Sequence, residues 1–190
     1  MLSGACPLTP PSGSGAVSNG GRAVRLERLD ETHLALVTGL VFDEQVRRFT
    51  RIPSEPPPGF PHAWLSGYLE GGRHERRAGF VVLDGAGTPV GLAVVPRFDR
   101  ETATAELGYI VAAAARGRGV ATGALALLGA WAFTELEAQR LELLIDVDNE
   151  ASKRVAERSG YVCEGVLRSL FVKENLRRDT EIWSLLPSDP

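Results

Sequence analysis

Several features that define other classes of protein are scarce in this sequence of 190 residues. It has only two cysteines, Cys6 and Cys163, so neither a disulfide framework nor a cysteine-based metal site can be built from it. The three histidines, His33, His62 and His74, are scattered, and apart from the neighbour of His74 no cysteine or carboxylate stands at ligand spacing. We therefore expect no bound metal.

Long apolar runs and an excess of one charge are also missing. No apolar run reaches the ~18 residues that cross a bilayer, and the N-terminus lacks the basic start and apolar core of a secretory signal. These absences predict a cytoplasmic protein with no membrane partner. The formal net charge is only -3, so nothing in it points to nucleic acid as a partner.

What the sequence does contain is enough apolar material for one domain. Hydrophobic residues make up 44% of the chain, which suits a single core of this size. Residues 1–21 are rich in glycine, proline and serine without a hydrophobic period, which predicts a disordered tail. We expect residues 22–187 to form the domain.

The hydrophobic periods predict a mixed α+β fold. Hairpin patterns come first, and a long apolar helix then joins two strands that must be parallel neighbours. The expected sheet is therefore mostly antiparallel, with one parallel pair. Expected strands cover residues 23–26, 78–84, 90–95, 102–111, 141–147, 161–170 and 181–186; expected helices start at Asp30 and cover 62–70, 121–136 and 149–160; a proline-rich linker spans 53–61 and a polar loop 173–179.

A glycine and arginine turn opens the long apolar helix, and we interpret it as a phosphate cradle. The first N–H groups of a helix have no partners and carry partial positive charge. Glycines leave those groups unobstructed, and arginines add charge-assisted hydrogen bonds. The turn contains Arg116, Gly117, Arg118, Gly119, Val120, Ala121 and Thr122.

Three nucleotide-binding patterns compete for this turn. The P-loop is excluded because its lysine and its spacing do not occur. The dinucleotide fingerprint is matched in two of its three glycines, with Asp146 as a possible ribose partner, but the preceding antiparallel hairpins disfavour it. The pattern Arg/Gln-x-x-Gly-x-Gly/Ala is satisfied in full by Arg116, Gly119 and Ala121.

With the segments around the turn, the chain resembles the GNAT acyltransferase superfamily, within it the RimJ/RimL-type branch of ribosomal-protein N-terminal acetyltransferases. The resemblance covers residues 23–186. Its marks are Glu-Leu-Gly-Tyr at 106–109, the turn itself, Asn-x-x-Ser-x-x-Val-x-x-Arg-x-Gly-Tyr at 149–161, and Glu-Gly-Val-Leu-Arg at 164–168. It implies the GNAT fold, with helices on both sheet faces and a parallel strand pair that splays apart to bind acetyl-CoA.

The resemblance also implies roles for individual residues. Residues 116–122 would bind the diphosphate of acetyl-CoA, while the backbone of Tyr109, Ile110 and Val111 would pair with the pantetheine arm. Asn149 and Ser152 fall where the family contacts this arm and the thioester sulfur. Asn149 is equally well read as a helix cap, and Ser152 as an ordinary first-turn residue or as the acid that protonates the thiolate.

Glu106 is the best candidate for the general base, directly or through water, because it would point to the opposite side of its strand from Leu107 and Tyr109. It could equally be a carboxylate that faces solvent. Cys163 has no base near it in the sequence, so we expect a core residue rather than a nucleophile.

The predicted function is direct transfer of acetyl from acetyl-CoA to a primary amine, most simply a protein N-terminal α-amine. Acetylation of a small-molecule amine, such as an antibiotic or polyamine, and acyl-CoA binding without turnover are the alternatives. The loops around residues 53–64 and 173–179 are expected to select the acceptor, and the chain to act as a monomer or homodimer.

Overall fold

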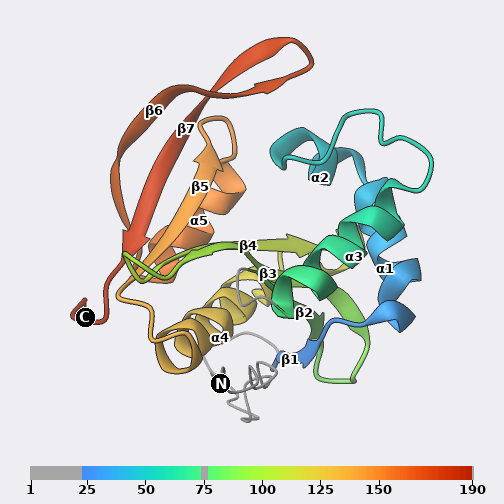
Figure 1. Ribbon diagram of the computed structural model, residues 1–190, viewed down its shortest axis with the longest axis horizontal. Coiled ribbons are helices and arrows are strands. Elements are labelled where there is room, and N and C mark those ends of the chain that lie inside the picture. Colours follow the sequence, from blue (N-terminus) through green and yellow to red (C-terminus); the bar gives the residue numbers. More distant parts are fainter. Residues whose placement is uncertain (1–22, 74–76, 190) are drawn as a thin grey trace, which may run out of the picture.

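The computed structural model describes residues 23–73 and 77–189. The expected disordered tail, residues 1–21, lies outside the described residues. Figure 1 shows a central sheet with helices on both of its sides and a long C-terminal hairpin that rises from one edge. The mixed α+β class predicted from the hydrophobic periods is confirmed.

The sheet has seven strands in the order β1-β2-β3-β4-β5-β7-β6. Within the described residues, β4 and β5 form the one parallel pair and every other neighbouring pair is antiparallel. The strands are β1 Arg25–Arg28, β2 Ala78–Leu83, β3 Pro89–Asp99, β4 Thr104–Val111, β5 Arg140–Asp146, β6 Val162–Lys173 and β7 Leu176–Leu185.

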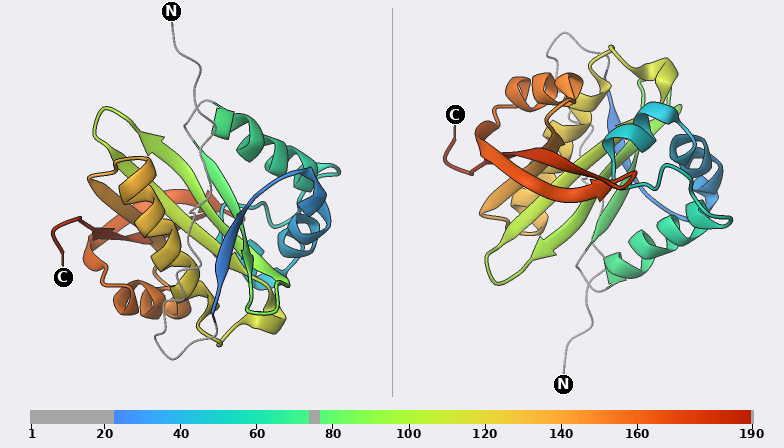
Figure 2. Two further views of the ribbon diagram at one scale, coloured as in Figure 1. Left: turned by 90° about the horizontal axis from the view of Figure 1, so that it is seen from below. Right: turned by 90° about the horizontal axis from the view of Figure 1, so that it is seen from above.

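Two hydrophobic clusters, one on each face, bury the sheet. The long helix α4 and the shorter α5 pack on one face, where Trp131 meets Phe80 edge-on with ring centres 4.8 Å apart. Helices α1 to α3 cover the other face (Figure 2). The helices are α1 Leu34–Val41, α2 Glu44–Phe49, α3 Phe60–Arg73, α4 Val120–Glu135 and α5 Glu150–Arg158, with short 3-10 turns at Glu31–His33 and Ala113–Ala115.

Helix α3 is longer than the sequence predicted, because Gly71 lies within the helix and does not end it. We expected it to cover residues 62–70 and to end at Gly71, but it runs from Phe60 to Arg73. Gly67 and Gly71 lie one turn apart, and a Cβ on Gly71 would stand 2.8 Å from the Cβ of Arg77. The glycines allow Arg77 to approach the helix rather than mark its end.

The C-terminal hairpin also differs from its prediction. Instead of a polar loop over residues 173–179, β6 and β7 continue to a two-residue turn at Glu174 and Asn175, which have φ angles of 52° and 60°. Two left-handed residues in sequence are typical of a tight hairpin turn. The polar residues 177–179 belong to a strand because β6 and β7 reach beyond the core.

Strand β6 is the edge of the sheet, and its residues are mostly exposed. The prediction that Cys163 lies in the core is therefore wrong, because Cys163 is a free, exposed cysteine. Apolar spacing alone could not reveal that the strand has a neighbour on one side only. None of the helices in the described residues is long and apolar enough to span a membrane.

Candidate functional site

The parallel strands β4 and β5 separate after a short contact. They pair only from Thr104 to Glu106 and from Arg140 to Glu142, although β4 continues to Val111 and β5 to Asp146. We call the unpaired parts, residues 107–111 of β4 and 143–146 of β5, the fork. The predicted splayed parallel pair is confirmed.

The hydrogen-bond register shows which backbone groups face the fork. Ala112 donates its N–H to the carbonyl of Val90 at 2.9 Å, so residues 110 and 112 turn their main-chain groups toward β3. Tyr109 and Val111, at alternate positions, turn theirs toward the fork. Of the three residues predicted to pair with an extended ligand, Ile110 therefore turns its main-chain groups to β3 and not to the fork. Its side chain is buried under helices α1 to α3.

The predicted cradle, residues 116–122, follows directly from the end of β4. Gly117 and Gly119 have φ angles of 71° and 78°, a backbone conformation that favours glycine. Gly119 is the N-cap of α4 without a side-chain cap, and the first helical bond closes from the Gly123 N–H to the Gly119 carbonyl at 3.0 Å. The N–H groups of residues 120–122 therefore have no acceptor within the helix.

The two arginines of the cradle differ in what they contact. Arg116 is held by Asp43 at 2.7 Å, by the Gln45 amide oxygen at 3.0 Å and by the Val111 carbonyl at 3.0 Å. Burial raises the pKa of Asp43, but the hydrogen bonds from Arg116 and from the Val46 N–H outweigh it and lower the pKa. Arg118 is exposed, so its side chain is the one able to meet a phosphate here.

The hydroxyl of Tyr109 on β4 lies near Ser152 in the first turn of α5. Asn149 is a helix cap, because its side-chain oxygen accepts the Ser152 N–H at 3.1 Å. Burial raises the pKa of Tyr109 to about 12, and the nearby Ser152 hydroxyl lowers it slightly. Even so, no atom of the described residues meets hydrogen-bond geometry with the Tyr109 hydroxyl, and the same holds for Tyr161.

These unpartnered hydroxyls test whether the fork suits an extended ligand with amide and thioester groups. A buried hydroxyl without a partner is costly, and a polar ligand in the fork would supply one to Tyr109. Together with the free main-chain groups of Tyr109 and the helix-start N–H groups, they fit a long carrier that ends in phosphates. The residues present are therefore compatible with coenzyme A.

Glu106 lies where β4 and β5 begin to diverge. Its carboxylate is only 11% exposed and pairs with Arg51 at 3.1 Å, so it is not a carboxylate in open solvent. Leu107 packs on the α4 face, and Glu106 points to the other face as predicted. It lines a cleft of about 550 Å³, which we call the Glu106 cleft. The residues that line this cleft are Arg51, Arg77, Pro96, Arg97, Phe98, Glu106, Leu144, Leu170 and Phe171.

Three arginines of this cleft were missed by sequence reasoning. Arg51 follows α2, Arg77 precedes β2 and Arg97 lies on β3, so the cleft gathers side chains far apart in the sequence. Two of its other residues, Leu170 and Phe171, belong to the hairpin that was predicted as a shorter strand. The glycine pair in α3 was the one local signal, because it marks where Arg77 packs.

The contacts of Asp146 exclude the ribose-binding role considered for it. Arg178 holds Asp146 with two bonds of 3.0 Å, so Asp146 is not free for a ribose. Although burial raises the pKa of Asp146, its bonds to Arg178 lower it. Within the described ranges 23–73 and 77–189, no three histidines, cysteines or carboxylates lie close enough together to hold a metal ion.

Comparisons with known proteins describe what the chain resembles. A profile of the acetyltransferase (GNAT) domain matches residues 23–162. YdaF of Bacillus subtilis (strain 168), named as a candidate ribosomal N-acetyltransferase, is 34% identical over 100 residues, or 53% of this chain and 55% of YdaF. The chain spans about half the length of the curated relatives it matches.

Solved structures share the fold over most of the chain. A spermidine N-acetyltransferase from Vibrio cholerae, in complex with CoA and spermine, has a TM-score of 0.78 at 20% identity and covers 87% of this chain and 96% of its own. RimL, a ribosomal L7/L12 α-N-protein acetyltransferase in complex with coenzyme A, has a TM-score of 0.79 at 17% identity, with coverages of 86% and 93%. At these identities the likeness is one of fold.

Proposed function

Because the chain belongs to the GNAT acetyltransferase family, we propose that it transfers the acetyl group of acetyl-CoA to a primary amine, and that this amine is a protein N-terminal α-amine. The observation that carries the proposal is the fork. Two parallel strands stop pairing after residue 106, with a helix start without side-chain caps at one end and a carboxylate at the other.

The coenzyme would lie along the fork. The N–H groups of residues 120–122 and the Arg118 side chain would bind its diphosphate, and Arg116 would hold the turn in place. The main-chain groups of Tyr109 and the N–H of Val111 would pair with the pantetheine arm as an added strand does, while the Val111 carbonyl accepts its bond from Arg116. When bound, acetyl-CoA supplies the acetyl thioester, and residues of the chain bind it, orient it and transfer the protons.

Glu106 would take the proton that the amine loses as its nitrogen attacks the acetyl carbon, directly or through one water. Ser152 would donate a proton to the departing thiolate of coenzyme A and take up another from solvent water, to which Glu106 releases the proton of the amine. The pKa of Tyr109 near 12 keeps its hydroxyl neutral at pH 7, so Tyr109 can donate a hydrogen bond beside Ser152. No covalent intermediate with the protein is needed.

The choice of an α-amine follows from the cost of deprotonation. An α-amine with a pKa near 7.8 loses its proton at pH 7 for about 1 kcal/mol, whereas a lysine near 10.4 costs about 4.6 kcal/mol. One carboxylate is enough to accept the proton of an α-amine. The similarity to RimL and to YdaF supports a protein acceptor, and the similarity to a spermidine acetyltransferase supports a small amine as the alternative.

The test is release of free thiol from acetyl-CoA in the presence of N-terminal peptides, polyamines and aminoglycosides. We expect the peptides to stimulate release most. Binding of coenzyme A without release for any amine would instead show a binding module and would overturn the proposal. Stimulation by polyamines or aminoglycosides alone would keep the transfer reaction but replace the acceptor.

A further inference from the structure

The Glu106 cleft carries more positive than negative charge. Its lining includes Arg51, Arg77 and Arg97, and among the described residues Glu106 is the one carboxylate that lines it. The ion pair between Arg51 and Glu106 uses one charge of each sign. Within the part of the chain that the structure describes, no carboxylate forms an ion pair with Arg77 or Arg97, so their guanidinium groups can meet whatever enters the cleft.

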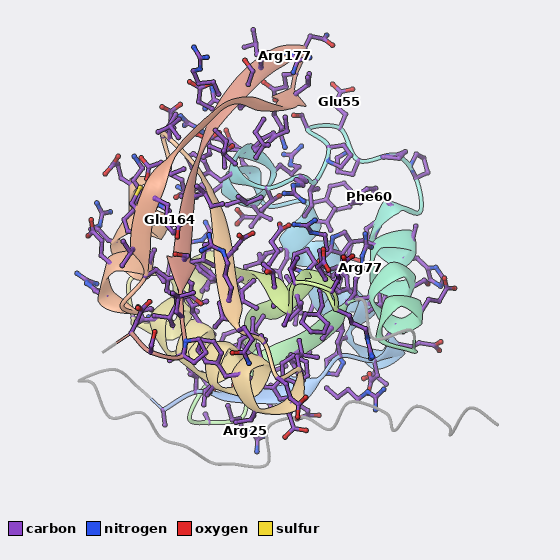
Figure 3. The ribbon with its side chains drawn as sticks, turned by 60° about the vertical axis from the view of Figure 1, so that its left-hand side comes forward. Arg25, Glu55, Phe60, Arg77, Glu164 and Arg177 are labelled. Atoms are coloured by element: carbon purple, nitrogen blue, oxygen red, sulfur yellow. The ribbon has the colours of Figure 1, made fainter. Side chains whose placement is uncertain are left out.

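Arg77 is held in the cleft by the fold itself. It lies along α3, where a Cβ on Gly71 would be 2.8 Å from the Arg77 Cβ and one on Gly67 would be 3.5 Å from its Nη1. Its guanidinium stands 5.8 Å from the ring centre of the buried Tyr68. Glycine inside a helix costs about 1 kcal/mol relative to alanine, so this groove exists at some expense of helix stability. Figure 3 shows Arg77 between α3 and the sheet.

Arg97 stands level with the carboxylate. Its Cα is the register partner of Glu106 across β3 and β4, and its side chain is exposed. Arg97 on β3 and Arg77, just before β2, therefore line the same cleft as Glu106. A group bonded to the reacting amine would pass between them.

The coenzyme phosphates do not account for these arginines. From Glu106 to Val111 the chain advances five residues along β4, which is about 17 Å at 3.3 to 3.4 Å per residue. The cradle lies beyond that point. Arg77 and Arg97 are at the opposite end of the fork from the cradle, on the side where the acceptor would enter.

We infer that the acceptor carries negative charge close to its amine, as does a protein N-terminus followed by aspartate or glutamate. This inference rests on the proposed function of the same site. Carboxylates near the amine would bind Arg77 and Arg97 with charge-assisted hydrogen bonds. A polyamine would meet like charge there and be disfavoured.

The experiment uses the full chain, acetyl-CoA and three heptapeptides that differ only at positions 2 and 3: Asp-Asp, Asn-Asn or Lys-Lys after an N-terminal serine. Free glutamate and spermidine complete the panel, because glutamate distinguishes a small acidic amine from a peptide. We expect kcat/KM to fall about tenfold from Asp-Asp to Asn-Asn and further to Lys-Lys, and the preference to shrink as salt is added.

The variants Arg77→Gln and Arg97→Gln should each lower kcat/KM for the Asp-Asp peptide about tenfold and leave the Lys-Lys peptide unchanged or improved. Arg25→Gln, on the opposite edge strand β1, is the matched control and should change neither. Arg97 is exposed, so its variant should fold even if Arg77→Gln does not. Equal or better turnover of Lys-Lys or spermidine would overturn the inference.

A failure of the proposed function gives a different result. If no amine releases thiol, binding of the same peptides, fluorescently labelled at the C-terminus, to the coenzyme-saturated protein decides the question. Tighter binding of Asp-Asp that is lost in Arg97→Gln would support the inference without turnover. Equal binding of all three peptides would overturn it.

Discussion

At the scale of single residues, Glu106 combines a low exposed fraction with a position at the base of the fork. Its partner across the parallel pair is Glu142, which is bound by Arg140 at 2.7 Å. Two carboxylates at the same level of the sheet thus have different surroundings. Only Glu106 faces the cleft.

This difference gives a matched test of the proposed base. Glu106→Gln should lower kcat/KM by about 10²-fold or more, because a general base contributes about 10²- to 10⁴-fold. The affinity for coenzyme A and the melting temperature should barely change, since Arg51 is more than half exposed. Glu142→Gln is the control for removing a carboxylate nearby. Nearly full activity of Glu106→Gln in steady-state assays would mean that the proton goes elsewhere.

At the scale of elements, the start of α4 depends on Gly119 as its N-cap. Gly119→Val would force a β-branched residue into a left-handed conformation, at a cost of about 1–2 kcal/mol, and place methyl groups beside the N–H groups of residues 120–122. We expect the dissociation constant for coenzyme A to rise at least tenfold by calorimetric titration, the loss of about one charge-assisted bond.

Gly59→Val is the control for backbone strain. Gly59 has a φ of 81° with open space around it, so the substitution carries the same conformational cost away from the cradle. Its melting temperature should fall about as far as that of Gly119→Val, with coenzyme affinity unchanged. Equal affinity losses in both variants would show that strain, and not the cradle, is responsible.

The hairpin of β6 and β7 is tied to α2 by one side chain. Lys173 donates from its ammonium group to the carbonyls of Arg47, of Thr50 at 2.9 Å and of Ile52 at 2.5 Å. Figure 1 shows the hairpin bending toward α2. Because Leu170 and Phe171 line the Glu106 cleft, this contact holds one of its walls.

Lys173→Met should therefore loosen the cleft more than the cradle. We expect KM for the acceptor to rise several-fold with KM for acetyl-CoA unchanged, and the melting temperature to fall by a few degrees, from the loss of about 1–2 kcal/mol of hydrogen bonding. Arg177→Met, at the same hairpin but bonded to Ser169 instead of α2, serves as control. An unchanged acceptor KM in Lys173→Met would separate the hairpin from acceptor binding.

At the scale of the whole molecule, an ion pair joins two strands that are not neighbours in the sheet, because β7 lies between β5 and β6. Arg140 on β5 binds both oxygens of Glu164 on β6, at 2.8 and 2.5 Å, and the Ser184 hydroxyl donates to the same carboxylate at 2.6 Å. The Arg140 and Ser184 hydrogen bonds lower the pKa of Glu164 from 4.5 to about 2. Folding therefore favours the ionised form.

Glu164 is expected to stabilise the folded protein more at neutral pH than at acid pH. Since the pKa is lower in the folded protein, the stabilisation is complete above pH 4.5 and is lost as the pH falls toward 2. Glu164→Gln should melt below the wild type at pH 6, and the difference should vanish near pH 2. The effect will be modest because the side chain is 40% exposed. Thermal unfolding by circular dichroism, with the exposed Glu157→Gln as control, checks it; a difference that does not vary with pH would contradict it.

What could be predicted from sequence was local. The glycine turn before α4 and the Asn149 cap depend on residues within a few positions of one another. The fork joins residues 107–111 to residues 143–146, and it was expected only from the resemblance to the GNAT family. Three features could not be predicted, because each depends on which strand or helix lies alongside. They are the packing of Arg77 against α3, the exposure of Cys163 and the length of the hairpin. Gly71 was predicted to end the helix, because the contact that requires a glycine there is a tertiary one, made by Arg77 beyond the helix.

The short helix α2 is fastened at both ends. Asp43, its cap, is bound by Arg116 of the cradle, and the carbonyls at its far end hold Lys173, while Arg51 just after it grips Glu106. Helix α2 therefore connects the predicted cradle to the Glu106 cleft. If coenzyme binding at the cradle displaces α2, then Arg51 moves relative to Glu106, and linkage requires the acceptor to change the affinity for the coenzyme by the same factor.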